Sequence, residues 1–200
     1  MRGNGSSGKT VRQAQHGTRG AAHGSTTTTA VTGDGEPGLA WEQRLAAAWS
    51  RYDTLPASEF RAVIEALAAE LPADSAVAAF ERAGAFDSTG QPARAVPLYR
   101  IALERGVRGA RRRRAKIQLA SSLRNLGRPE EGVVLLSPEL DAENDELDDA
   151  VRAFLALCLA DAGREREALS LALGALAPHL PRYQRALGHY AHQLSTPAGS

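Results

Sequence analysis

The sequence contains few of the residues that build disulfide-rich or membrane-spanning proteins. Its one cysteine, Cys158, cannot form an internal disulfide, which excludes a fold held together by disulfide bonds. No stretch of eighteen residues is free of charge, and the N-terminus lacks the apolar segment of a signal peptide. The formal net charge is +1, so the chain as a whole is not a strongly basic nucleic-acid binder. These absences predict a cytoplasmic protein with no membrane partner.

β-Branched and aromatic residues are also scarce. The chain has nine Val and three Ile against 38 Ala and 24 Leu, and aromatic residues make up 5% of it. Ala and Leu lead the scale of helix propensity, whereas Val and Ile favour strands. The composition therefore predicts an all-α fold.

Residues 1–38 differ in kind from the rest of the chain. They hold nine of the 19 glycines and a run of four threonines, and they contain no aromatic residue. Such a segment buries too little apolar surface to offset the entropy that it would lose on ordering. We expect residues 1–38 to form a disordered Gly/Ser/Thr-rich tail and residues 196–200 to form a disordered end.

From Leu39 onward, apolar residues recur at helical spacing between turn signals. Short connections make neighbouring helices antiparallel, so the expected structural unit is a helical hairpin. The pattern predicts helices at residues 39–53, 57–71, 75–88, 91–105, 110–126, 129–137, 145–162, 165–177 and 181–194.

Three glycines, Gly90, Gly127 and Gly163, mark an internal repeat with spacings of 37 and 36 residues. Small residues recur on both sides of these glycines, as paired helices require where they approach closely. Seven positions before the glycines stand Ala83, Ala120 and Ala156, and five positions after them stand Ala95, Gly132 and Ala168.

This pattern resembles the tetratricopeptide repeat family, whose 34-residue unit carries small and aromatic residues at fixed places in both helices. The first copy matches best, with Ala83 and Phe86 followed by Ala95 and Tyr99. Phrases such as ARAVPLYRIALERG, together with 22 Arg against two Lys, favour a small actinobacterial member. The resemblance implies a right-handed α-α superhelix with a divergent hairpin at 39–74, three repeats at 75–178 and a capping helix at 179–195.

The resemblance also implies a protein–protein interaction module that is not an enzyme, with a concave groove lined by the first helix of each repeat. In this chain the centre of that groove is cationic and its flanks are apolar. We therefore expect a protein or peptide partner, with acidic character favoured, and no cofactor. The expected groove residues are Phe80, Arg114, Ile117, Ser121, Arg124, Asn125 and Leu157.

The run Arg111–Arg114 has three interpretations: a solvated helix start, contact with an acidic protein, or binding of nucleic acid. Cations oppose the macrodipole at a helix N-terminus, so helix stability does not favour this run. Nucleic acid is the least favoured partner of the run, because no stacking aromatics or recognition-helix pattern accompany it. The acidic run at 139–149 caps the next helix or pairs with Arg111–Arg114, and both alternatives stay open.

A complete P-loop pattern, GNGSSGKT, spans Gly3–Thr10. A working P-loop has a buried strand before it and a helix N-terminus after it, but only two residues precede Gly3. We interpret the match as chance, which leaves nucleotide binding as the least favoured function. His189 and His192 lack the further ligands of a metal site, so we expect no metal.

Overall fold

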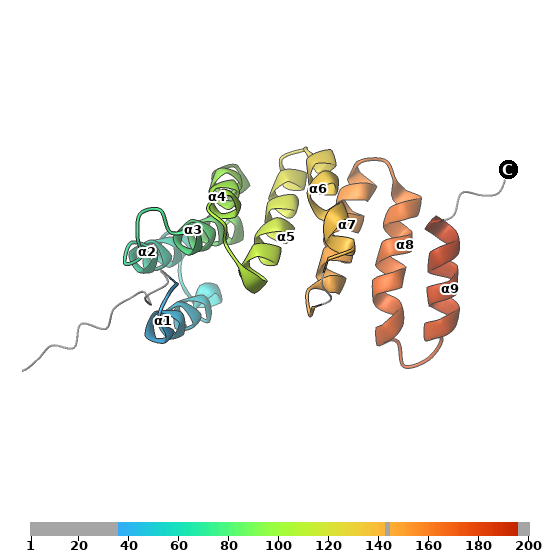
Figure 1. Cartoon of the computed structure of the whole chain (residues 1–200), viewed down its shortest axis with the longest axis horizontal. Helices are drawn as coiled ribbons and strands as arrows, with labels where there is room; N and C mark the ends of the chain where they lie inside the picture. The colour runs from blue at the N-terminus through green and yellow to red at the C-terminus, as the bar shows by residue number, and fades with distance from the viewer. Residues whose placement is uncertain (1–35, 143–144, 196–200) are drawn as a thin grey trace, which may run out of the picture.

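The computed structural model describes residues 36–142 and 145–195, and all the elements in these ranges are helices (Figure 1). The all-α prediction is confirmed for this part of the chain. The predicted end at 196–200, the motif Gly3–Thr10 and all but the last three residues of the predicted tail lie outside the described residues. The nine α-helices within the described ranges are α1 (Leu39–Trp49), α2 (Ala57–Ala68), α3 (Ala76–Ser88), α4 (Pro92–Glu104), α5 (Gly109–Asn125), α6 (Pro129–Leu136), α7 (Asp148–Asp161), α8 (Glu165–Leu176) and α9 (Gln184–Ser195). Three short 3₁₀ helices join them, η1 (Tyr52–Thr54), η2 (Ser137–Leu140) and η3 (Ala177–His179).

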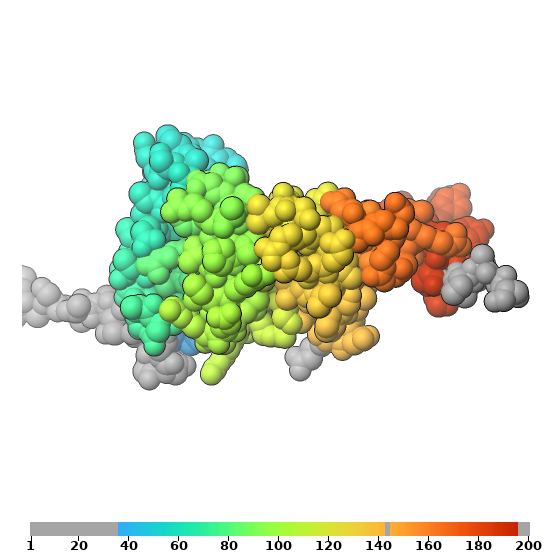
Figure 2. Space-filling view, turned by 90° about the horizontal axis from the view of Figure 1, so that it is seen from above, coloured from blue at the N-terminus to red at the C-terminus, as the bar shows by residue number. Residues whose placement is uncertain are grey.

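Consecutive helices pack as hairpins, with α3 against α4, α5 against α6 and α7 against α8. The first helices of successive hairpins also touch, because α5 contacts both α3 and α7. The hairpins follow one another in chain order along the long axis of the molecule (Figures 1 and 2). The predicted array of helical hairpins is therefore confirmed.

The three repeat glycines end the first helix of each hairpin in the same way. Gly90, Gly127 and Gly163 have φ angles of +74°, +72° and +75°, a left-handed conformation that favours glycine. In each turn the residue after the glycine donates its backbone N–H to the carbonyl five positions earlier, as in a Schellman motif. These bonds run from Gln91 to Phe86, from Arg128 to Leu123 and from Arg164 to Leu159. The same local turn thus sets the direction of the second helix in each of these three hairpins.

The small residues of the repeat lie where helices meet. Ala83, Ala120 and Ala95 are completely buried, and Ala156 is 6% exposed. Gly132 lies closest to a neighbouring helix, since a Cβ atom added there would stand 2.6 Å from the Sγ atom of Cys158. Close approach of α6 to α7 therefore depends on the missing side chain at this position.

The first helical pair forms its own core against the start of α3. Trp41 is 1% exposed, and its indole N–H donates a hydrogen bond to the backbone oxygen of Leu67 at 2.9 Å. The Trp49 ring meets Phe60 edge to face, with 5.0 Å between the ring centres. Both tryptophans therefore contribute to packing, and α1 is held across the side of α2 and α3.

Four predicted boundaries are wrong by three or four residues, and one of them is the end of the second helix, which lies at Ala68 instead of residue 71. The first helix ends at Trp49 instead of residue 53, and the chain continues into η1. The helix expected from residue 145 begins at Asp148, after a turn in which the Asp145 carboxylate accepts the backbone N–H of Leu147. The last helix begins at Gln184, whose side-chain amide donates to the carbonyls of Pro178 and Leu180 and so holds a turn before the helix.

Candidate functional site

The basic run Arg111–Arg114 occupies the first turns of α5, and three of its four guanidinium groups pair with carboxylates. Arg111 donates to both oxygens of Glu42 at 2.9 and 2.6 Å, and its Nε donates to Glu81 at 3.1 Å. Arg112 donates to Glu139 at 3.3 Å. The run is therefore largely neutralised within the molecule.

Arg113 is the buried member of the run, with 5% of its surface exposed. Its Nη1 lies 2.5 Å from an oxygen of Asp145 and 2.7 Å from one of Asp148, and its Nη2 donates to the backbone oxygen of Glu139. Of the two alternatives for the acidic run, pairing with Arg111–Arg114 is therefore present. Asp148 also lies in the first turn of α7, where negative charge is favourable.

The nucleic-acid alternative depended on the positive charge of the run Arg111–Arg114, and these pairs neutralise most of that charge. A phosphate-binding surface needs cations that face solvent without carboxylate partners. Arg111, Arg112 and Arg113 instead hold α5 to three other parts of the chain: α1, α3 and the segment between α6 and α7.

Arg114 differs from its three neighbours. It is exposed, and among the residues that the structure describes it forms no ion pair. Its guanidinium carbon lies 5.5 Å from the centre of the Phe80 ring, within the range of a cation–π contact. Arg114 is thus the cation of the run that remains available to a ligand.

A polar stripe continues from Arg114 along α5. Gln118, Ser121 and Asn125 follow at four, seven and eleven residues, so they lie on the same side of the helix as Arg114. The side-chain oxygen of Gln118 is buried without a hydrogen-bond partner in the described part of the chain. At the far end, Arg124 pairs with Asp161 of α7 at 2.7 Å and links the stripe to the next hairpin.

The structure corrects two of the seven expected groove residues. Phe80 and Ile117 are 2% and 5% exposed and belong to the cores between hairpins, so neither can line an open groove. Ser121 and Arg124 are half-buried, Asn125 is exposed, and Leu157 on α7 is 43% exposed. We call Arg114, Ser121, Asn125 and Leu157 the first-helix face.

Beside Arg114 lies a hollow that sequence reasoning did not predict. It has a volume of about 360 Å³, and α1, α3 and α5 contribute to it. Trp49 lies over Gly84, where an added Cβ atom would be 3.2 Å from the indole ring. The indole N–H of Trp49 donates a hydrogen bond to Glu81 at 3.0 Å. No sequence signal placed α1 beside the first-helix face. The lining residues are Glu42, Leu45, Ala46, Trp49, Glu81, Arg111 and Arg114.

Glu81 is a titratable residue that lines this hollow. Burial raises the pKa of the Glu81 carboxyl, against the opposing effects of Arg111 and of the Trp49 hydrogen bond. A carboxyl whose folded-state pKa is raised keeps its proton to higher pH than the unfolded chain does. Ionisation of Glu81 therefore lowers the free energy of unfolding as the pH rises.

We expect this cost to appear in the pH dependence of stability. The free energy of unfolding of the parent should fall relative to that of Glu81→Gln as the pH rises above about 4.5, the ordinary pKa of glutamate. The difference should level off once Glu81 is ionised in the folded state. Urea unfolding at a series of pH values measures it, and a parent that gains stability relative to the variant over this range would contradict the assignment.

The described residues contain no cluster of three or more His, Cys, Asp or Glu side chains suited to a metal ion. The Cys158 thiol is buried, and burial raises its pKa, which disfavours the reactive thiolate. None of the helices in the two described ranges is long and apolar enough to cross a bilayer.

Stacked helical hairpins with repeated left-handed glycine turns define a helical repeat protein. A scan against family models matches residues 76–194 to the family described as Tetratrico peptide repeat, and the chain belongs to this family. The match extends past the three expected repeats to include α9. Neither the curated proteins nor the solved structures contain a match. The comparisons do not support the expected actinobacterial origin. Tetratricopeptide repeats generally act as protein–protein interaction modules and are typically non-catalytic.

Proposed function

We propose that this protein is a non-catalytic binding module whose first-helix face holds an extended, acidic segment of a partner protein. The observation that carries the proposal is the Arg114 guanidinium, which forms no ion pair with any other described residue and lies at the edge of the hollow beside Trp49. A carboxylate of the partner would satisfy Arg114, and a neighbouring apolar side chain would enter the hollow against Leu45 and Trp49.

The rest of the first-helix face supports an elongated ligand. Ser121 and Asn125 supply hydrogen-bonding groups along roughly 16 Å of α5, counted at 1.5 Å per residue from Arg114. Leu157 adds exposed apolar surface on the next hairpin. Affinity would then come from a row of modest contacts, as in other repeat proteins that bind extended segments.

The test uses a random peptide display library selected on the immobilised full chain at low salt. We expect the selected peptides to contain Asp or Glu next to a large apolar residue. The best peptides are then labelled and titrated by fluorescence anisotropy against the parent, Arg114→Glu and Arg108→Glu. Arg108 is a matched control because it is exposed, pairs with no carboxylate among the described residues, and lies on another side of the start of α5.

Arg114→Glu should weaken binding at least tenfold, or about 1.4 kcal/mol, mainly through slower association. Arg108→Glu should leave the affinity within about twofold of the parent, because a distant exposed charge contributes little at contact range. Equal affinity of the parent and Arg114→Glu would remove the first-helix face as the binding site. Selection of peptides without acidic residues would refute the charge assignment.

A further inference from the structure

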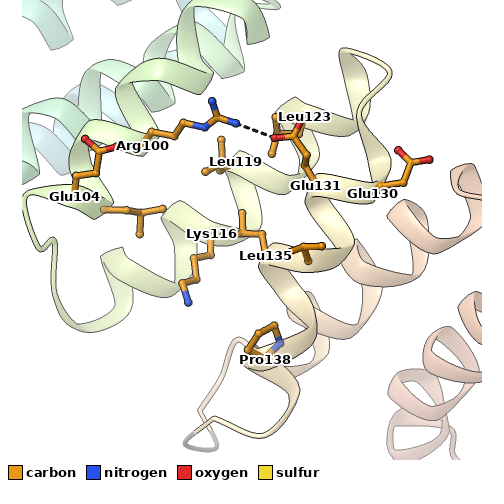
Figure 3. A pocket seen from close by; sticks show the side chains of 11 residues that line it. Arg100, Glu104, Lys116, Leu119, Leu123, Glu130, Glu131, Leu135 and Pro138 are labelled. Carbon is orange, nitrogen blue, oxygen red and sulfur yellow. Dashed lines mark hydrogen bonds and ion pairs between the residues drawn. The ribbon is translucent and has the colours of Figure 1, made fainter.

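A second hollow lies on a different side of the molecule, between the second helices α4 and α6, with α5 as its floor (Figure 3). Its volume is about 670 Å³. Leu123, on its floor, follows Arg114 by nine residues, which is two and a half helical turns. The hollow therefore faces away from the first-helix face, and we call it the α4–α6 groove. Its apolar lining residues are Leu103, Leu119, Leu123, Val134, Leu135 and Pro138.

The apolar lining of the α4–α6 groove is open to solvent on one wall. Val134 on α6 is 74% exposed, although it sits beside the half-buried Leu135. The residues at the same place in the other two repeats, seven after the repeat glycine, are Pro97 and Ser170. An exposed valine at this point is thus particular to the middle repeat, and no residue of its own hairpin covers it.

The rim of the groove carries unpaired negative charge. Arg100 pairs with Glu131 at 2.9 Å across the groove, and Lys116 pairs with Glu139. Glu104 and Glu130 are exposed and form no ion pair with any other described residue. They lie on opposite walls, with the leucines between them (Figure 3). The groove therefore suits an apolar or aromatic ridge that is flanked by positive charge.

The chain itself carries such a ridge at α9. Tyr183, just before the helix, is 77% exposed, and Tyr190 is 60% exposed. Both tyrosines line one shallow hollow at the start of α9, together with Arg185, so they lie on the same side of the helix. Arg182 and Arg185 are exposed without an ion pair among the described residues, and no Asp or Glu follows Glu167 in the sequence.

The α9 ridge of one molecule cannot enter the groove of the same molecule. Helix α9 packs on α8 and η3 at one end of the array, and α7 and α8 lie between it and α6 (Figure 1). Any contact between the two surfaces therefore joins two molecules. Exposed tyrosines are well suited to such a contact, because each ring adds a large apolar area with little loss of side-chain entropy.

We propose that the α4–α6 groove of one molecule receives the Tyr183–Tyr190 side of α9 from a second molecule. Val134 packs against the rings, and Glu104 and Glu130 attract Arg182 and Arg185. The contact is heterologous, because the two molecules use different surfaces, so each added molecule leaves a new groove or a new α9 open. Assembly then either continues with concentration or closes into a ring.

The experiment measures the mass of the full chain by sedimentation velocity and light scattering over a wide concentration range. We expect the average mass to rise with concentration at low salt and to rise less at high salt, since the rim attraction is screened. Val134→Lys should block the groove, and Tyr190→Glu should block the ridge. Each should weaken self-association at least about tenfold. Leu39→Lys is the matched control, because Leu39 is 75% exposed and lies outside both surfaces.

Mixing the two blocked variants gives the decisive result. The Val134→Lys chain keeps a working α9, and the Tyr190→Glu chain keeps a working groove, so the mixture should form a 1:1 complex that does not grow further. Circular dichroism of each variant confirms that the fold is retained. A monomeric parent at every concentration at low salt, a mixture that fails to pair, or unchanged self-association of Val134→Lys would each overturn the proposal.

Discussion

Replacing Arg113 with alanine is expected to lower the free energy of unfolding by about 3–5 kcal/mol, the usual cost of breaking a buried ion pair. Arg113 is 5% exposed and contacts Asp145, Asp148 and the backbone oxygen of Glu139. Its loss leaves the Glu139 carbonyl without this donor and two carboxylates without their buried cation. Of its ion pairs to α5 among the described residues, the segment between α6 and α7 would keep those that Arg112 and Lys116 form with Glu139.

Arg112→Ala is the matched control for this prediction. Arg112 is the preceding residue and also pairs with Glu139, but its side chain is 49% exposed. Solvent screens that pair, so the expected cost is below about 1 kcal/mol. Chemical unfolding followed by circular dichroism measures both variants. Similar small losses for the two would show that Arg113 does not hold the segment between α6 and α7.

The helices and their turns could be predicted from sequence because the interactions that form them are local. Gly127 ends a helix through its own backbone conformation and through a hydrogen bond that spans five residues. The apolar periodicity on either side of it is equally local. The boundaries that failed depend on side chains of the turn itself, such as the Gln184 amide, whose two carbonyl acceptors have no sequence signature.

The candidate site was less predictable because its charges are satisfied by distant residues. Glu42 lies 69 positions before Arg111, and Glu81 lies 30 positions before it. No spacing rule connects such residues before the hairpins are stacked. Counting along the first helices placed Phe80 in the groove, but the approach of Trp49 and the packing of α5 bury that region. The face that remains open begins at Arg114.

At Gly132, packing determines which residue type is tolerated, and the repeat pattern alone does not. The corresponding positions of the other repeats hold Ala95 and Ala168, so the pattern suggests that alanine would be tolerated. The structure gives the opposite expectation. A Cβ atom at residue 132 would stand 2.6 Å from Cys158 Sγ and 3.3 Å from the backbone oxygen of Ala120. Both neighbours belong to helices that pack against α6, so neither moves without disturbing the array.

Gly132→Ala is therefore expected to lower the free energy of unfolding by about 1–3 kcal/mol, as overpacking of a core does. Gly174→Ala should do the reverse and raise it by up to about 1 kcal/mol, because Gly174 lies inside α8 with nothing within 4 Å of an added Cβ. The same substitution thus has opposite signs in two helices. Cys158→Ala removes the sulfur atom that the new Cβ would meet. Gly132→Ala should therefore cost much less stability in the Cys158→Ala background than in the parent. Urea unfolding of the four variants and the parent completes this cycle, and a stabilising Gly132→Ala would disprove the close contact between α6 and α7.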